Sequence, residues 1–248
     1  MRRSEWTREG YREIDVAVKS SEKSWLAYDA YLFDIDGTLL NCSDLVHYRA
    51  LNGAMREVYG VETTIDGIAY HGKTDVGILR AALERAGVTS DDFQTSLPRA
   101  LDVVRREVTR HASGLCPQVC AAIPEALDTL RAAGKLLGVA SGNLESVGWQ
   151  KISAASLRGF FSFGCFSDEC EHRAEIFGRA VSEVWKRSGD QAQVCFMGDT
   201  PEDIRAARAA RAHVIAICTG SYTAQELAQL APDFCVSSLA EMLVESET

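Results

Sequence analysis

The sequence predicts an α/β fold in which a doubly wound parallel sheet carries an inserted, all-helical cap. Short continuous apolar runs recur along the chain, and patterns of helical periodicity lie between them. This alternation is typical of parallel strands that are covered by helices on both faces. One stretch, residues 41–116, breaks the alternation because it holds helical patterns and no convincing buried strand. The alternation predicts the sheet, and the interruption predicts the cap.

Four apolar runs are the predicted strands of the sheet. Each is short and bounded by turn residues, as in a strand that is buried on both faces. Two amphipathic patterns between the runs predict covering helices, and Gly134 ends the first of them. The strands are Ala30–Phe33, Leu136–Ala140, Val194–Met197 and Val214–Cys218, and the helices span 124–133 and 176–184.

The predicted cap follows the first strand, so it is expected to lie above the carboxyl ends of the sheet, where open α/β folds bind ligands. Such a cap is a candidate lid over a binding site. The core would then comprise residues 29–40 and 117–248, with residues 1–28 as an N-terminal extension. Each of the three cap helices places apolar residues on one face. These residues are Leu45, Tyr48, Met55 and Val58; Ile78, Leu79, Ala82 and Leu83; and Leu97, Leu101, Val104 and Val108.

Composition and charge disfavour several classes of protein. The 248 residues include 26 Lys and Arg against 35 Asp and Glu, a formal net charge of −9, so nucleic acid is not expected as the main partner. No apolar run approaches the roughly 20 residues that cross a bilayer, so no membrane partner is expected. The extension mixes both charges without a hydrophobic stretch, which favours a cytoplasmic protein over a secreted one. Eight scattered cysteines lack zinc-knuckle spacing and are expected to be free thiols.

The first candidate site follows the first predicted strand. Asp34 stands at the strand end and Asp36 two residues later, so in extended geometry both side chains project to one side. Two carboxylates this close separate in proton affinity, which allows one to act as a nucleophile and the other as an acid. Gly37 permits a sharp turn with free amides, and Thr38 adds a hydroxyl, a set that suits an anionic oxygen. The alternative is an ordinary Asp-Gly turn.

The second candidate site follows the strand Leu136–Ala140. Ser141, Gly142 and Asn143 offer a hydroxyl and backbone amides at the same edge of the sheet. Such groups can hold a phosphate oxygen, although the same tripeptide also suits a plain turn before a helix. The position of the tripeptide is what makes it a candidate binding site.

The third candidate site follows the strand Val194–Met197. Asp199 at this strand end would join Asp34 around a hard divalent cation such as Mg²⁺, which prefers carboxylate and water oxygens. Thr200 and Asp203 fit a helix capping box, with a proline at the first helical position. Asp203 is therefore expected to start the helix and to position the metal ligands without binding the metal itself.

A cation is needed beside these carboxylates, and two residues compete for the role. Arg173 begins the helical pattern before the last motif, and Lys151 lies in the predicted helix after Ser141. Arg173 is the preferred choice. A solvated arginine in a first helical turn is the alternative interpretation. The five histidines show no metal-ligand spacing and receive no chemical role.

Together DIDGTLL, ASGN, Arg173 and MGDTPED resemble the four ordered motifs of the haloacid dehalogenase superfamily. The similarity spans residues 31–236 and is greatest to the phosphoglycolate-phosphatase-like branch, which has a helical cap after the first strand. It implies a Rossmann-like core and a Mg²⁺-dependent phosphatase for a small phosphorylated metabolite. Two departures stand out. Arg173 replaces the usual lysine, and Arg211 stands where relatives often end a helix with glycine.

The resemblance also implies roles for individual residues. Asp34 would become an aspartyl phosphate, and Asp36 would protonate the leaving oxygen and later activate water. Asp34, Asp199 and the backbone carbonyl of Asp36 would hold the metal, and Ser141 would bind the phosphoryl group. The cap loop 70–75 resembles one that faces the active site, so Lys73 would contact the substrate. A surface lysine before a helix start is the equally weighted alternative.

Two other functions share these motifs. A phosphoryl-transferring mutase of the β-phosphoglucomutase type differs only in its cap and in how well it excludes water. A binding protein with a vestigial pocket would keep the fold alone. The intact Asp34, Asp36 and Asp199 favour an enzyme.

Overall fold

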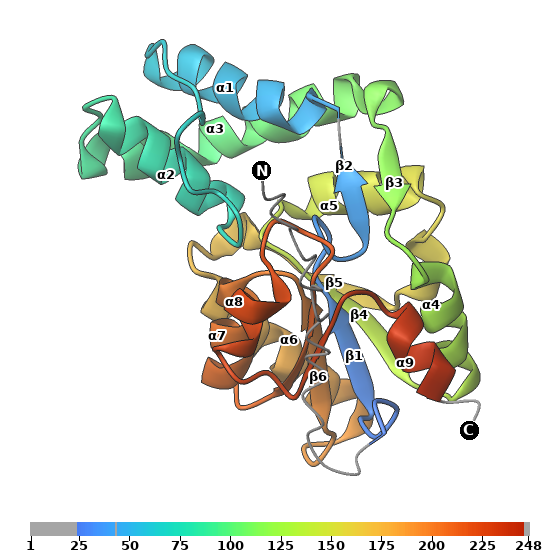
Figure 1. Ribbon diagram of the computed structural model, residues 1–248. Helices are drawn as coiled ribbons and strands as arrows, with labels where there is room; N and C mark the ends of the chain where they lie inside the picture. Colours follow the sequence, from blue (N-terminus) through green and yellow to red (C-terminus); the bar gives the residue numbers. More distant parts are fainter. Residues whose placement is uncertain (1–23, 43, 246–248) are drawn as a thin grey trace, which may run out of the picture.

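A six-stranded parallel sheet forms the centre of the structure, a computed structural model that describes residues 24–42 and 44–245 (Figure 1). The strand order is β5-β4-β1-β6-β7-β8. The strands are β1 (Ala30–Phe33), β4 (Leu136–Ala140), β5 (Phe163–Cys165), β6 (Val194–Gly198), β7 (His213–Ile217) and β8 (Phe234–Val236). β1 lies between β4 and β6. The chain adds β4 and β5 on one side of β1 and then β6, β7 and β8 on the other side. This is the switch point at which doubly wound sheets bind ligands.

The predicted α/β fold is confirmed, and each predicted strand is present within one residue of its expected bounds. β5 and β8 were not predicted. Both are three-residue strands at the sheet edges, too short to produce a recognisable apolar pattern.

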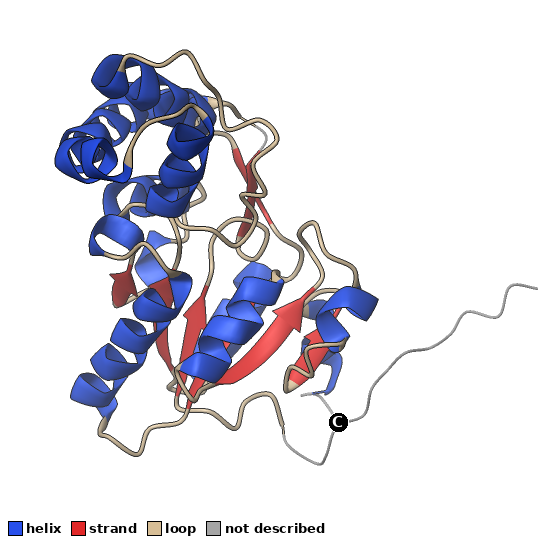
Figure 2. Ribbon diagram, turned by 90° about the vertical axis from the view of Figure 1, so that its left-hand side faces the viewer, coloured by secondary structure: helices blue, strands red, loops and turns tan. Residues whose placement is uncertain are grey.

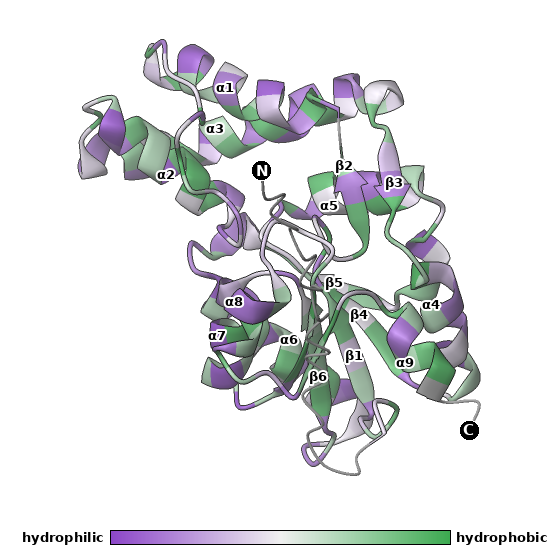
Figure 3. Cartoon of the chain, viewed as in Figure 1, coloured by the Kyte–Doolittle hydropathy of each residue, from purple (hydrophilic) through white to green (hydrophobic). Residues whose placement is uncertain are grey.

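Helices cover both faces of the sheet (Figure 2). One face packs against α4 (Ile123–Ala132), α5 (Glu145–Ala154) and α9 (Ala240–Glu245). The other packs against α6 (Arg173–Ser188), α7 (Pro201–Ala209) and α8 (Ala224–Ala228). Successive strand residues alternate between these two cores, and the strands of the sheet are accordingly hydrophobic along their length (Figure 3). Short 3₁₀ turns lie at Ala112–Gly114, Arg158–Phe160 and Ser167–Glu169.

Residues 24–28 were predicted as the inner end of the N-terminal extension, and in the structure they pack against the core. Trp25 and Tyr28 are buried in the apolar cluster on one face of the sheet, where both rings contact Tyr31, and each is only 1% exposed. The Tyr31 hydroxyl donates a hydrogen bond to the carbonyl of Trp25. Burial of two aromatic side chains ties this segment to the core. Residues 1–23 of the predicted extension lie outside the described residues.

Three helices, α1 (Val46–Tyr59), α2 (Asp75–Arg85) and α3 (Ser90–Arg110), pack together around their own apolar cluster. A two-stranded antiparallel ribbon, β2 (Leu40–Cys42) and β3 (Pro117–Val119), joins them to the sheet (Figure 1). We call this helical group the cap. Leu45 was expected on the buried face of α1, but it precedes the first helical turn and is 50% exposed. Among the described residues, no helix is long and apolar enough to cross a membrane.

Candidate active site

The three candidate motifs meet at the carboxyl edge of the sheet. Asp34 follows β1, Ser141 follows β4 and Asp199 follows β6, and these three strands are neighbours. The backbone N–H of Asp34 donates to the carbonyl of Met197 at 2.9 Å, so the pairing of β1 with β6 continues into the site. Parallel neighbours end on the same side, and this brings residues 34 and 199 together.

A buried cluster of carboxylates forms there. Oxygens of Asp34, Asp199 and Asp203 all lie within 4.8 Å of one another. The Arg173 guanidinium lies 2.7 Å from an oxygen of Asp34 and 2.7 Å from an oxygen of Asp203. Three carboxylates facing one guanidinium leave an excess of negative charge.

The pKa values of the cluster reflect this excess. Burial raises the pKa of Asp34 to about 6, because the Arg173 charge offsets only part of the cost and Asp203 and Asp36 add repulsion. Burial, followed by repulsion from Asp203 and Asp34, raises the pKa of Asp199 to about 8. A bound cation would relieve both effects.

Two loops hold the Asp199 carboxylate in place. The Thr38 hydroxyl donates to Asp199 Oδ1 at 3.0 Å. Gly37 and Gly220 approach Oδ2 so closely that a Cβ atom would lie 2.3 Å and 1.7 Å from it, respectively. Gly37 also has a φ of +87°, which only glycine adopts readily.

The free amides expected in the first motif are not observed. The Gly37 N–H donates to the carbonyl of Leu40 at 2.8 Å, and the Thr38 N–H donates to that of Ile35 at 3.3 Å. The chain turns back into β2 here, and the turn uses both amides. The expectation that these amides are free for an anion is therefore wrong. In this structure the two residues shape the turn and hold Asp199.

Asp203 combines the two roles expected of it. Its Oδ2 accepts a hydrogen bond from the Thr200 backbone N–H at 3.0 Å, which completes the capping box that starts α7, and a second from the Thr200 hydroxyl at 2.7 Å. Its Oδ1 faces Arg173. Asp203 therefore fixes both the helix and the guanidinium that lies beside Asp34.

Lys151 and Arg173 both reach the site, but they serve different carboxylates. Lys151 Nζ lies 2.9 Å and 2.7 Å from the two oxygens of Asp36 and 2.9 Å from Asn143 Oδ1. Its side chain is only 4% exposed. The sequence left a choice between the two cations, whereas the structure assigns one to Asp34 and the other to Asp36.

Asp36 differs from Asp34 in its electrostatics. Desolvation of the Asp36 carboxylate by neighbouring protein groups raises its pKa, but the Lys151 charge and hydrogen bonds from Lys151 and Asn143 outweigh this effect, so the net pKa lies below the usual value. The two carboxylates separate in pKa, but in the direction opposite to the predicted roles, in which Asp36 is the acid and Asp34 the nucleophile. In the chain without a bound cation, Asp34 is the one that holds a proton more strongly.

The Asn143 side chain ties the first two motifs together. Its Nδ2 donates to Asp36 Oδ2 at 2.8 Å and to Ser141 Oγ at 3.0 Å, while its Oδ1 accepts from Lys151. All three polar positions of the amide are thus engaged within the protein. Asn143 was predicted to bind substrate, and here its side chain positions Asp36 and Ser141.

The cap loop rests on the second motif. The Asp75 N–H donates to the carbonyl of Gly142 at 2.8 Å, and the Leu144 N–H donates back to Asp75 Oδ2 at 2.9 Å. A Cβ at Gly142 would lie 2.5 Å from the carbonyl oxygen of Lys73. The loop therefore borders the site, while the Lys73 side chain is exposed and its contact with substrate stays a prediction.

Asp75 and His47 form a contact beside the site that the sequence did not predict. The carboxylate of Asp75 is 3.1 Å from His47 Nε2 as well as bonded to Leu144. In the sequence, Asp75 follows a threonine N-cap and resembles any first-turn acidic residue. Its role depends on the docking of the cap, which local sequence does not specify.

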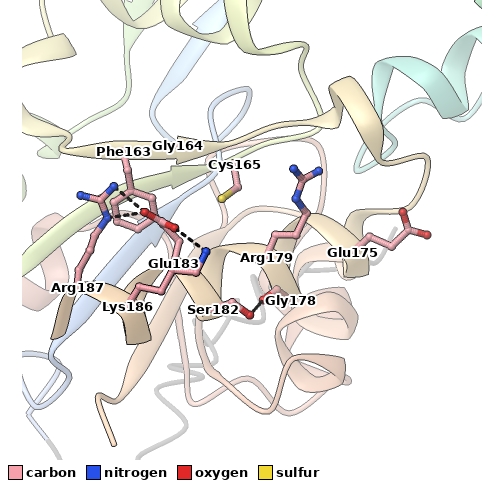
Figure 4. A pocket seen from close by; sticks show the side chains of 10 residues that line it. All are labelled: Phe163, Gly164, Cys165, Glu175, Gly178, Arg179, Ser182, Glu183, Lys186 and Arg187. Atoms are coloured by element: carbon pink, nitrogen blue, oxygen red, sulfur yellow. Dashed lines mark hydrogen bonds and ion pairs between the residues drawn. The ribbon is translucent and has the colours of Figure 1, made fainter. Parts of the chain in front are cut away.

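A hollow of about 550 Å³ lies elsewhere, between β5 and α6 (Figure 4). Its lining includes Phe163, Arg179 and Glu183, but none of the clustered aspartates. Glu183 is already paired with Arg187 and Lys186. The hollow is therefore separate from the candidate active site.

The fold and the site together define an α/β protein with a buried cluster of carboxylates at the strand ends and a helical cap joined to the same edge. The sequence model of the haloacid dehalogenase-like hydrolases matches residues 31–217. The chain belongs to this family of hydrolases. A comparison with curated protein sequences found no significant match.

Solved structures share the fold. A predicted phosphoglycolate phosphatase from Haemophilus somnus has a TM-score of 0.62 at 19% identity, covering 88% of this chain and 98% of its own. CbbY from Rhodobacter sphaeroides, in complex with phosphate, has a TM-score of 0.64 at 19% identity, covering 87% and 96%. A CbbY mutant in complex with xylulose-(1,5)bisphosphate has a TM-score of 0.65 at 19% identity, covering 86% and 96%.

Proposed function

We propose that this hydrolase is a Mg²⁺-dependent phosphatase that cleaves the phosphomonoester of a small metabolite through an aspartyl-phosphate intermediate. The observation that carries the proposal is the buried carboxylate cluster of Asp34, Asp199 and Asp203 beside Asp36 and Ser141, at the switch point of the sheet. An electrophile held at this edge would meet a nucleophile, an acid and a hydroxyl at once.

The donor set fits Mg²⁺. Asp34 and Asp199 offer hard carboxylate oxygens, and burial together with repulsion from neighbouring carboxylates raises the pKa values of both, so a bound cation would be favoured here. Asp203 is occupied by Thr200 and Arg173, which leaves the first two side chains and the backbone carbonyl of Asp36 as the proposed ligands. Bound Mg²⁺ would reduce the repulsion between the Asp34 carboxylate and a phosphate dianion.

The proposed reaction has two steps. An oxygen of Asp34 attacks phosphorus and forms the acyl phosphate, while the P–O bond to the substrate breaks and Asp36 gives its proton to the leaving oxygen. Asp36 then takes a proton from water, whose oxygen attacks phosphorus and releases Asp34 and inorganic phosphate. Ser141 would bind a phosphoryl oxygen, and Arg173 would balance the charge on Asp34.

Asp36 needs a proton for the first step although its pKa is lowered in the chain alone. A phosphate dianion bound beside Asp36 adds negative charge, which raises the pKa of a neighbouring carboxyl group. Substrate binding would thus favour the protonated form of Asp36 at the stage that requires it.

The fold neighbours support a small phosphorylated substrate. CbbY was solved with phosphate, and a CbbY mutant with a sugar bisphosphate, and another neighbour is described as a predicted phosphoglycolate phosphatase. The cap over the carboxyl edge would limit the size of a substrate and exclude water during transfer.

The decisive experiment is a panel of metabolite phosphates assayed for free phosphate, with Mg²⁺ and with a chelator. Metal-dependent release of phosphate from at least one small phosphomonoester is expected. Isomerised sugar phosphate without free phosphate would indicate the mutase instead. The absence of both reactions would reject catalysis and favour a binding protein.

A further inference from the structure

Lys151 is a buried cation for which the two-step reaction above has no use. We infer that it is a positioning residue that holds the Asp36 carboxylate in the orientation needed for proton transfer to the leaving oxygen. This inference rests on the proposed function, because it assumes that Asp36 exchanges a proton with the leaving group.

The contacts of Lys151 form a closed triangle. Its ammonium reaches both oxygens of Asp36, at 2.9 Å and 2.7 Å, and also Asn143 Oδ1 at 2.9 Å. Asn143 completes the triangle with its own hydrogen bond to Asp36 Oδ2 at 2.8 Å. Two independent donors therefore fix the rotation of one carboxylate.

The exposed fractions of the side chains show which residue of the triangle is the anchor and which residue it holds. The Lys151 side chain is 4% exposed, and it lies on the inner face of α5 with Val147 and Gly148. The Asp36 side chain is 44% exposed. A rigid helix thus carries the anchor, and the anchored group is the one that opens to the reactants.

Arg173 does not duplicate this role. Its guanidinium contacts the proposed nucleophile, Asp34, and also Asp203, the carboxylate that caps α7. Loss of Lys151 leaves those contacts in place. The two cations are therefore expected to affect different parts of the reaction.

The consequence depends on the leaving group. An alkyl phosphate needs a proton from Asp36 as its P–O bond breaks, whereas a nitrophenolate leaves readily without one. Misplacement of a catalytic group by about 1 Å lowers the rate about 100-fold. Loss of the anchor should therefore harm alkyl phosphates most.

The test is steady-state kinetics of Lys151→Met with an alkyl phosphate and with nitrophenyl phosphate, in the presence of Mg²⁺. We expect kcat for the alkyl phosphate to fall about 100-fold with little change in KM, and kcat for nitrophenyl phosphate to fall much less. Lys151→Arg keeps the charge and should recover part of the loss. Lys186→Met removes a lysine that is 73% exposed and should match the wild type.

Equal losses on both substrates, or no loss, would overturn the role of Lys151. Thermal unfolding checks that Lys151→Met is folded. If Lys151→Met does not fold, Lys151→Gln takes its place in the same kinetic comparison. A wild type without phosphatase activity would reject the proposed function and the inference with it. That outcome is distinct from an active wild type whose variants lack the leaving-group dependence.

Discussion

Two buried cations contact different acidic side chains of the site. Arg173 lies 2.7 Å from Asp34 and from Asp203, while Lys151 contacts Asp36. The chemical character of each carboxylate is therefore set by its neighbours rather than by its residue type. Single substitutions can therefore test the contribution of the nucleophile separately from those of the groups around it.

Asp34→Asn tests the nucleophile. The amide keeps the shape of the side chain, and Arg173 keeps its contact with Asp203, so the fold should persist. Turnover of an aryl phosphate should fall by at least about 1,000-fold, because no carboxylate remains to form the acyl phosphate. Asp128→Asn, at a side chain that is 58% exposed, is the matched control. Retained turnover in Asp34→Asn would remove Asp34 from its assigned role.

The raised pKa values predict how stability depends on pH. Without a cation, the pKa values of Asp34 and Asp199 are about 6 and about 8, above those of an unfolded chain. The folded state therefore binds more protons, and the free energy of unfolding should fall as pH rises from about 5 to about 8. Thermal unfolding in chelator measures this fall, which Asp199→Asn should reduce and added Mg²⁺ should oppose. A transition temperature that rises over this range would contradict the prediction.

Individual residues were predictable where they follow a strong strand signal. Asp34, Ser141 and Asp199 each end a continuous apolar run, so the parallel sheet alone brings them to one edge. The contact of Lys151 with Asp36 was not predictable, because it depends on the rotation of α5 against the sheet. Tertiary packing fixes that rotation, and local sequence does not.

The helices and strands also divide into those that the sequence predicted and those that it did not. Long apolar or amphipathic segments were recognised, whereas β2, β3, β5 and β8 contain three residues each and acquire their identity from their partners. Helix ends are set more locally. A left-handed residue follows the last turn of both α4 and α7, and it is Gly134 in one case and Arg211 in the other.

The end of α7 is a site of local strain. Arg211 has a φ of +57°, which costs a non-glycine residue about 1–2 kcal/mol, and its side chain is exposed. Arg211→Gly should raise the free energy of unfolding by about 1 kcal/mol and leave activity unchanged. Gly134→Ala, at a φ of +70°, should lower it by a similar amount. Denaturant titration measures both, and shifts of the same sign would contradict this account.

At the scale of the whole molecule, the cap docks on the segments that carry the chemistry. Arg80 of α2 contacts Glu171, and Arg105 of α3 lies 2.8 Å from Asp168. Both acidic residues belong to the segment that leads from β5 to Arg173. The segment between β5 and Arg173 therefore supports both the cap and the Arg173 guanidinium.

Gly142→Ala tests whether this docking matters. The new Cβ would lie 2.5 Å from the Lys73 carbonyl oxygen and 3.0 Å from the Thr74 Cα, and both are backbone atoms that a rotamer change does not move. The cap loop must therefore shift away from the second motif, and kcat/KM should fall at least about tenfold because the cap would no longer be held over the site. Small-angle X-ray scattering should report a larger radius of gyration.

Gly53→Ala is the matched control for this test. Gly53 lies within α1, and no neighbouring group is within 4 Å of the position that a Cβ would take, so alanine should be accepted and should stabilise the helix by about 1 kcal/mol. Its scattering profile and kcat/KM should equal those of the wild type. If Gly142→Ala behaved in the same way, the close approach of the cap loop to the second motif would not govern turnover. A larger radius with unchanged kcat/KM would separate cap docking from catalysis.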